Sequence, residues 1–268
     1  MSINHYENFP VASLLLPARL RRPIGLIYRF ARSADDLADE GNWSDAQRLA
    51  LLADYHEELR RIEHNEPTRQ QMFHEFAPIV REYQLPLTLF HELLSAFEQD
   101  VTKKRYADFD EVVDYCRRSA NPVGRLLLHL FGKTDAQSRA QSDHICSALQ
   151  LINFLQDVAI DYEKGRIYLP MDEMQRFGIT AAQIAHRDTG GGWSSFVFFQ
   201  IERCREMLRT GMPLGRTLKG RTGLEIRMTI AGGARILDKI AAVNGDIFNH
   251  RPVLRRLDWL RMLGRAVR

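Results

Sequence analysis

Two pairs of aspartates, each spaced four residues apart inside an apolar stretch, constrain this chain more than any other feature. Asp35 and Asp39 form the first pair, and Asp157 and Asp161 form the second. Residues four apart in an α-helix lie on the same face, where like charges repel each other. Because the chain carries this repulsive arrangement twice, we infer that a bound cation offsets the repulsion. Ligand sets made only of oxygen favour Mg²⁺, which takes one or two carboxylates together with water and phosphate oxygens.

Each pair continues into a longer polar stripe at helical spacing. The first stripe consists of Tyr28, Arg32, Asp35 and Asp39, and the second of Gln150, Asn153, Asp157 and Asp161. The other residues of both segments are largely apolar, which is typical of buried helices. A carboxylate buried without a partner costs too much free energy to persist. We therefore expect the two stripes to face each other across a cleft that holds metal ions and a diphosphate.

The aspartate pairs have two other possible explanations. In the first, both helices are simply amphipathic and the carboxylates face water. The matching arginine and amide side chains within the stripes argue against this. In the second, the carboxylates bind a di-iron centre in a helical bundle. Such a centre requires Glu-x-x-His motifs, and the chain contains none.

Helical periodicity dominates the whole sequence, and convincing strand alternation is absent. We expect helices at 24–40, 44–64, 68–83, 87–102, 108–131, 136–164, 194–210, 224–249 and 253–265. Pro23 and Gly41 bracket the first of these, and Ser44 is a plausible N-cap of the second. The glycine-rich segment 188–193 is expected to be the most flexible loop. These features predict an all-α fold, with residues 1–268 forming a single helical bundle domain.

Composition excludes several classes of protein. The net charge is only +3, and no basic run alternates with aromatic residues, so nucleic-acid binding is not expected. The three cysteines are far apart and show neither zinc nor disulfide spacing, which favours reduced thiols. No uncharged apolar stretch approaches the roughly 18 residues needed to span a bilayer. The N-terminus lacks the features of a signal peptide, so we expect a cytoplasmic protein.

The segment after the second stripe is expected to bring further polar groups to the aspartates. Gly165 can end the helix in a left-handed turn, which leaves Arg166 and Tyr168 close to the carboxylates. The guanidinium of Arg166 suits bidentate contact with phosphate. The alternative is a salt bridge from Arg166 to Glu163 or Asp161.

These motifs resemble those of the squalene/phytoene synthase family. The resemblance is carried by Asp35-Asp-Leu-Ala-Asp39, by Asn153-Phe-Leu-Gln-Asp157-Val-Ala-Ile-Asp161 and by Arg166-Ile-Tyr168. Segments 5–13 and 119–124 look most like the bacterial hopanoid-pathway hydroxysqualene synthases. The resemblance covers nearly the whole chain and implies the class I terpenoid (isoprenoid) synthase fold.

The resemblance also implies a reaction and a set of site residues. The reaction is Mg²⁺-dependent ionisation of presqualene diphosphate, followed by water capture of the rearranged cation to give hydroxysqualene; NADPH is not expected. The implied metal ligands are Asp35, Asp39, Asn153, Asp157 and Asp161. The groups implied near the diphosphate are Tyr28, Arg32, Gln150, Arg166, Tyr168 and Arg251. His5 and Phe9 fall in an N-terminal segment that contacts the substrate in relatives.

Other functions remain open. The chain could instead be a presqualene diphosphate synthase, or a squalene or phytoene synthase acting on farnesyl or geranylgeranyl diphosphate. It departs from relatives at Gln156, where they often carry arginine, at segment 6–8, and in having no tyrosine after Tyr168. These changes weaken diphosphate contacts and favour the second-step enzyme, working beside other enzymes of the squalene pathway. A catalytically dead assembly protein of the same fold is a different class of alternative.

A carbocation requires a dry cavity with aromatic faces. Phe9, Tyr28, Phe131 and Phe154 are candidates for lining it, although each is also an ordinary core residue. Gly124 could make room for a chain-shaped ligand, or simply accompany a proline kink.

Residues 251–268 form a basic amphipathic C-terminal segment in which leucines alternate with arginines. Such a segment can lie on an anionic membrane surface, which would place the protein at the inner face of the membrane. The alternative, which we favour from sequence alone, is a last helix packed on the bundle.

Overall fold

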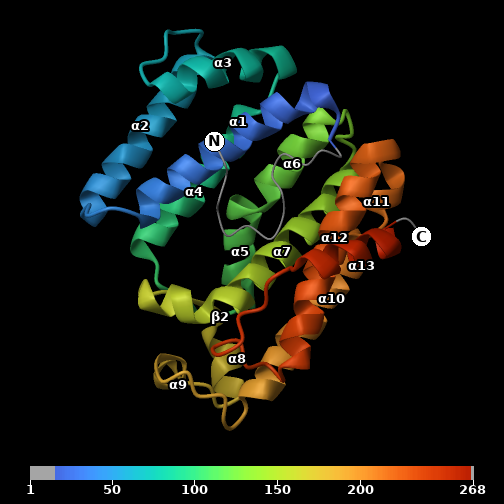
Figure 1. Cartoon of the computed structure of the whole chain (residues 1–268). Helices are drawn as coiled ribbons and strands as arrows, with labels where there is room; N and C mark the ends of the chain where they lie inside the picture. The colour runs from blue at the N-terminus through green and yellow to red at the C-terminus, as the bar shows by residue number, and fades with distance from the viewer. Residues whose placement is uncertain (1–15, 267–268) are drawn as a thin grey trace.

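The computed structural model describes residues 16–266, and this part of the chain is almost entirely helical (Figure 1). His5 and Phe9 lie outside the described residues. The longer helices are α1 (Ala18–Asp39), α2 (Asp45–Glu63), α3 (Gln71–Tyr83), α4 (Leu87–Thr102), α5 (Phe109–Ser119), α6 (Asn121–Leu130), α7 (Ala136–Glu163), α10 (Trp193–Gly211), α12 (Gly220–Ala242) and α13 (Arg256–Ala266). Three further helices are short, namely α8 (Met171–Arg176), α9 (Ala181–Ala185) and α11 (Leu214–Thr217). The predicted all-α class is confirmed.

Helix α1 begins at Ala18, six residues before the predicted start, with Pro23 inside the helix. Proline has no N–H to donate to the carbonyl four residues earlier, which here is the carbonyl of Arg19. The Tyr83 hydroxyl donates to that carbonyl oxygen at 3.1 Å. A tertiary contact thus satisfies the acceptor that Pro23 leaves free, and the helix continues through the proline.

The predicted helix at 108–131 is two helices, α5 and α6, which meet at Ala120. Pro122 occupies the first turn of α6, where its missing N–H costs nothing but prevents a continuous helix from α5. The Ser44 cap is confirmed as a capping box with Gln47 at the start of α2. Cys116, Cys146 and Cys204 are free thiols, as predicted.

The one pair of strands among the described residues was not predicted from the sequence. β1 (Arg105–Tyr106) pairs in parallel with β2 (Ile167–Pro170). The pair joins the segment after α4 to the segment after α7, which are more than 60 residues apart in the chain. It is too short to follow an alternating pattern, so only the tertiary structure reveals it.

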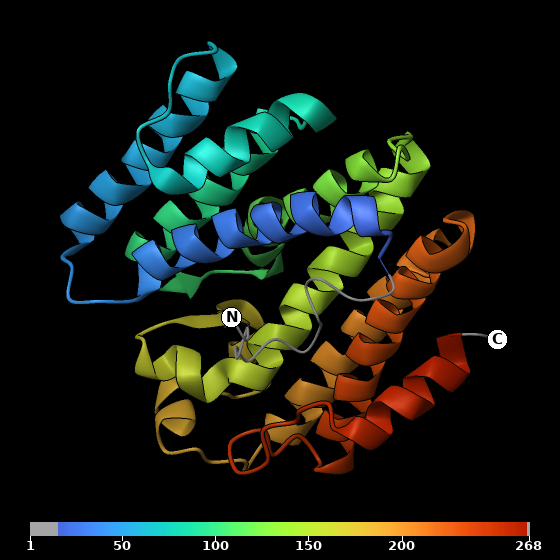
Figure 2. The same cartoon turned by 45° about the horizontal axis from the view of Figure 1, so that its top comes forward.

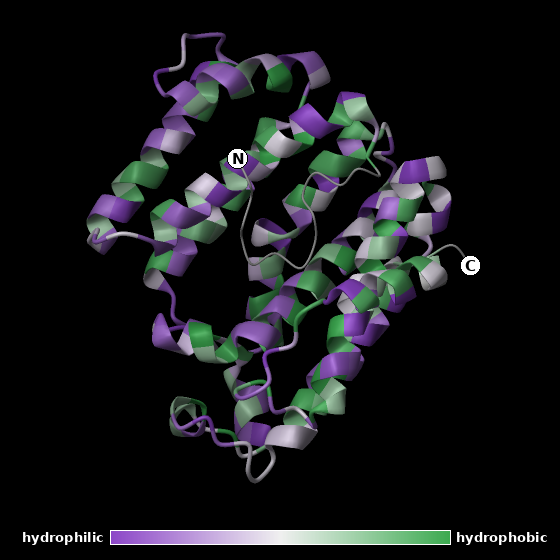
Figure 3. Ribbon diagram, viewed as in Figure 1, coloured by the Kyte–Doolittle hydropathy of each residue, from purple (hydrophilic) through white to green (hydrophobic). Residues whose placement is uncertain are grey.

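Buried apolar side chains form two main clusters. One is built by α1 to α4 with α6, and the other by α5, α7, α10, α12 and β2. Polar and apolar residues alternate around most helices (Figure 3), as expected when each helix turns one face to a core. Helix α1 belongs to the first cluster and α7 to the second, so the two polar stripes come from different parts of the core (Figure 2).

Candidate active site

The two polar stripes meet at their C-terminal ends. The Asp39 carboxylate, on the last turn of α1, forms ion pairs with Arg166 and with Lys164 Nζ, the latter at 2.8 Å. Both cations follow directly from α7, which carries the second stripe. This contact shows that the aspartates of the two helices lie in one region of the molecule.

Backbone geometry delivers Arg166 to that position. Gly165 adopts a left-handed conformation with φ of +79°, as predicted, and ends the helical path of α7. The Gly165 carbonyl accepts a hydrogen bond from Arg105 Nη1 at 2.6 Å, and Ile167 N donates to the Lys104 carbonyl at 3.0 Å. The turn is therefore held against β1. Arg166 pairs with Asp39, and not with Glu163 or Asp161 as in the alternative interpretation of the sequence.

Arg166 also contacts a buried hydrogen-bond network that was not predicted from the sequence. Asp100 on α4 is 3% exposed and accepts hydrogen bonds from the hydroxyls of Tyr115, at 2.5 Å, and Tyr168, at 2.7 Å. Arg166 Nε donates to the Asp100 carbonyl at 3.2 Å. The ring of Tyr168 stacks on Phe154 with 4.0 Å between centroids. Asp100 is one of three acidic residues of α4, with Glu92 and Glu98, and no motif in the sequence sets it apart.

At the second stripe, Asp157 pairs with Arg251. The guanidinium of Arg251 lies 2.7 Å from Asp157 Oδ1, and its predicted contact with diphosphate stays a prediction. Arg251 belongs to the connection between α12 and α13. Gln156 anchors that connection, because its amide nitrogen donates to the Pro252 carbonyl at 2.7 Å. Gln156 thus holds the residue that follows Arg251.

The other aspartate of each pair, Asp35 or Asp161, has a raised pKa. Burial, and then the charge of Asp39, raises the pKa of Asp35 to about 7. Burial, and then the charge of Asp157, raises the pKa of Asp161 to about 8. Burial also acts to raise the pKa of Asp39, but the hydrogen bond and charge of Arg166 outweigh it and the pKa is lowered. Each pair thus combines a carboxylate in a close ion pair with an arginine, Asp39 or Asp157, and a carboxylate with a raised pKa; of the latter two, Asp35 keeps a longer contact with Arg32 at 3.3 Å.

This donor set fits a divalent cation. Enclosed carboxylates with raised pKa values, each beside a second carboxylate, are the groups that a bound cation would stabilise. Across residues 16–266, no three His, Cys, Asp or Glu side chains converge into a cage for one ion. Mg²⁺ does not need such a cage, because it completes its shell with water and substrate phosphates. Asp35 keeps 36% of its side chain exposed, so such a ligand can reach it.

Arg32 lies between the acidic groups of α1. Its guanidinium contacts Asp35 at 3.3 Å, Asp36 at 2.8 Å and Glu40 at 3.2 Å. Arg32 thus pairs with one member of its predicted stripe, Asp35, and with Asp36 and Glu40, which lie outside it. The guanidinium already makes contact with carboxylates, which places a fixed positive charge at the edge of the site.

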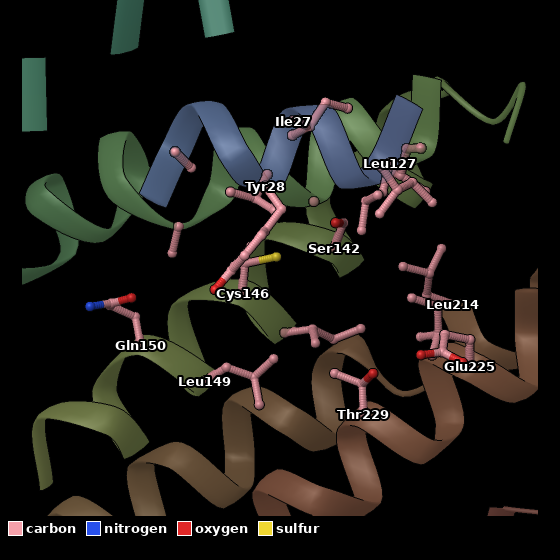
Figure 4. A pocket seen from close by; sticks show the side chains of 18 of the residues that line it. Ile27, Tyr28, Leu127, Ser142, Cys146, Leu149, Gln150, Leu214, Glu225 and Thr229 are labelled. Atoms are coloured by element: carbon pink, nitrogen blue, oxygen red, sulfur yellow. The ribbon is translucent and has the colours of Figure 1, made fainter. Parts of the chain in front are cut away.

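A cavity of about 450 Å³ opens beside the two stripes (Figure 4). It is mainly apolar and is enclosed by α1, α6, α7, α11 and α12. Tyr28 of α1 and Gln150 of α7 both point into it, and Asn153 also lines it. Tyr28 and Gln150 each precede an aspartate, Asp35 or Asp157, by seven residues, which is about 10 Å along the same helix face. The cavity therefore lies next to the carboxylates, along both helices.

The structure places some of the other predicted cavity residues at the cavity and one of them elsewhere. Phe131 and Gly124 line the cavity, in addition to Tyr28. Gly124 lies within α6 rather than at a kink, and a Cβ atom there would come within 2.5 Å of Ser142 and Cys146 side-chain atoms. Phe154 does not line the cavity; it packs on Tyr168 in the core.

Comparisons with known proteins agree with this geometry. The profile of the squalene/phytoene synthase family matches residues 3–258. A hydroxysqualene synthase of Rhodopseudomonas palustris is 35% identical over 233 residues, covering 86% of this chain and 78% of the relative. A hydroxysqualene synthase of Zymomonas mobilis is 40% identical over 185 residues, covering 66% of this chain and 59% of the relative. The match thus spans less than two thirds of that relative.

Solved structures give the same result. The crystal structure of squalene synthase HpnC from Alicyclobacillus acidocaldarius superposes with a TM-score of 0.83 at 34% identity, covering 90% of each chain. A dehydrosqualene synthase in complex with ligand has a TM-score of 0.85 at 19% identity, over 94% of this chain and 88% of the other, and shows the fold alone. The fold is that of a family of prenyl-diphosphate-processing enzymes. The chain belongs to the squalene/phytoene synthase family.

Proposed function

We propose that this protein ionises presqualene diphosphate with the help of Mg²⁺ and adds water to the rearranged cation, giving hydroxysqualene and diphosphate. The observation that carries the proposal is an apolar cavity lined by α1 and α7, the two helices that carry the aspartate pairs. Hydroxysqualene synthases are among the relatives at 35% to 40% identity, and they support this choice within the family.

The substrate has a diphosphate head and a long hydrocarbon tail, and the site offers surroundings for each. Arg32, Arg166 and Arg251 lie around the aspartates and would donate to phosphate oxygens. The carboxylates of Asp35, Asp39, Asp157 and Asp161, with the Asn153 amide, would hold the metal. Bound Mg²⁺ would neutralise negative charge that develops on the departing diphosphate. The apolar walls would accept the tail and exclude bulk water.

The chemistry then follows from the separation of these two environments. The bond between carbon and the diphosphate oxygen breaks, and its electron pair leaves with the diphosphate. The cation that remains lies against the cavity, where the ring of Tyr28 can face it. After rearrangement, one water adds through its oxygen and loses a proton, and this gives the alcohol. No hydride is consumed, so the reaction requires no NADPH.

Product analysis from presqualene diphosphate tests the proposal. The full chain with Mg²⁺ is expected to give hydroxysqualene in equal amounts with and without NADPH. Farnesyl diphosphate alone is expected to give no condensation product. Formation of presqualene diphosphate, squalene or phytoene from shorter diphosphates would assign the chain to another step of the family. Absence of diphosphate release from every substrate would favour an assembly protein without catalysis.

A further inference from the structure

Helix α13 has one face that is firmly docked on the bundle. Met262 and Ala266 are 2% and 3% exposed and form a small apolar cluster with Met228 of α12. Asp258 points inward and pairs with Arg235 Nε at 2.7 Å and Lys239 Nζ at 2.6 Å. The segment 256–266 is therefore a packed helix, as we favoured from sequence. This packing does not involve the opposite face of the helix.

The outward face of α13 is apolar. Leu257 is 70% exposed, Leu260 is 68% exposed and Leu263 is 43% exposed. Single exposed leucines are ordinary on protein surfaces, but neighbouring ones on the same helix face form a patch. Successive residues turn by about 100° around a helix, so Leu257 and Leu260 lie about 60° apart and form one ridge.

The charges beside this ridge all have one sign. By the same rotation, the exposed Arg256 and Arg261 lie on opposite flanks of the ridge. Asp258 is the one acidic residue in the sequence of α13, and its charge is already matched by Arg235 and Lys239. The outward face therefore presents leucines between arginines without a carboxylate from its own helix.

We propose that this leucine–arginine face of α13 docks on the surface of an anionic lipid bilayer. Leucines would enter the boundary between headgroups and acyl chains, and arginines would contact the anionic headgroups. A second copy of the chain fits less well, because a two-fold contact would bring the arginines of both copies together. Among residues 16–266 no helix is long and apolar enough to cross a membrane.

The inference goes beyond the proposed reaction and does not depend on it. It has a consequence for that reaction, because α12, on which α13 packs, also provides Thr229 and Ile236 to the cavity wall. Docking through α13 would therefore hold the wall of the cavity close to the lipid phase. This position suits an enzyme whose product does not dissolve in water.

Vesicle sedimentation of the full chain tests the docking. Vesicles of phosphatidylglycerol and phosphatidylcholine are compared with vesicles of phosphatidylcholine alone, at low and high salt. The wild type is expected to bind the anionic vesicles at least tenfold more tightly. Leu257→Gln with Leu260→Gln keeps a good helix former at both positions and is expected to weaken binding more than tenfold. Arg256→Gln with Arg261→Gln is expected to weaken it about thirtyfold, since each arginine contributes about fivefold.

A matched control uses exposed apolar residues elsewhere. Trp43 and Met171 are 51% and 49% exposed, and their replacement by Gln is expected to leave binding unchanged. Equal binding to both kinds of vesicle, or no effect of the α13 variants, would overturn the proposal. So would light scattering that shows a wild-type dimer which the leucine variant converts to monomer without a change in vesicle binding. Thermal unfolding of each variant confirms that the fold is retained.

Discussion

Arg166 and Asp39 form an ion pair that connects the end of α7 to the end of α1. The same guanidinium reaches the Asp100 carbonyl through Nε, at 3.2 Å. One side chain therefore links three helices, and it leaves little freedom in the position of Asp39. The predicted contact of Arg166 with phosphate stays a prediction, and the structure adds a role in orienting a carboxylate.

We predict that Arg166→Lys lowers kcat/KM for diphosphate release by about 100-fold, because a lysine ammonium cannot make both contacts of the guanidinium fork. Lys164→Gln is the matched control. Lys164 also contacts Asp39, at 2.8 Å, but its side chain is 44% exposed, and exposed ion pairs contribute little. Its loss should be less than about tenfold. Equal losses in both variants, measured by steady-state release of diphosphate, would contradict a special role of Arg166.

Asp35→Asn and Asp157→Asn are each expected to lower turnover by at least about 100-fold while the fold is retained. Asp35→Asn should not lower the unfolding temperature, because the substitution removes a carboxylate that burial and Asp39 disfavour. Asp36→Asn is the control, since Asp36 neighbours Asp35 in sequence but is not one of the proposed ligands. A loss below about tenfold is expected there. Normal diphosphate release by Asp35→Asn or Asp157→Asn would refute the ligand assignment.

Sequence reasoning predicted the parts of this molecule that repeat a local pattern. The range of α4 was correct at both ends, and the turn at Gly165 was predicted from its glycine alone. It did not predict contacts between distant segments. Tyr83 satisfies the carbonyl that Pro23 frees, and no local pattern contains both residues.

The candidate site divides in the same way. Helical spacing placed four aspartates on two stripes, but spacing cannot show which of them lies beside a cation. Asp100 was missed because it is one of three acids on α4 and belongs to no motif. Its role is defined by tyrosines from α5 and β2, which meet it only in the folded chain.

The stability of the protein should depend on the titration of Asp100. Burial raises the pKa of this carboxyl to about 6, above the value of 3.8 expected when unfolded. The neutral form is therefore favoured by folding, and stability is lost as the pH rises through about 4 to 6. We predict that the free energy of unfolding of the wild type, relative to Asp100→Asn, falls by up to about 3 kcal/mol between pH 4 and pH 7.

Asp114→Asn controls for this titration. Hydrogen bonding to Arg117 lowers the pKa of Asp114, so any contribution of that carboxylate is present above pH 4 and is lost below it. The two substitutions should therefore show slopes of opposite sign in denaturant unfolding across pH. A pH-independent difference for Asp100→Asn would mean that Asp100 keeps an ordinary pKa in the folded protein.

Gly124→Ala should reveal whether the cavity needs close packing of α6 on α7. The added Cβ would lie 2.4 Å from Ser142 Oγ and 2.5 Å from Cys146 Sγ, so the helices or side chains must shift. We expect a loss of about 1–3 kcal/mol in unfolding free energy and a higher KM for the isoprenoid substrate. Gly25→Ala in α1 is the matched control, because its Cβ meets nothing within 4 Å. It should stabilise the helix by about 0.5–1 kcal/mol.

A second set of substitutions distinguishes two causes of the Gly124→Ala defect: crowding between α6 and α7, and obstruction of the cavity. Adding Ser142→Ala and Cys146→Ala removes both crowded atoms, and since these two groups are hydrogen-bonded to each other, removing both should cost little. Stability should then recover, and KM should return toward that of the wild type. If the triple variant regains stability while KM stays high, the new methyl group itself occupies space that the substrate needs. If Gly124→Ala instead matches Gly25→Ala in both measurements, α6 can move away from α7 and Gly124 does not shape the cavity.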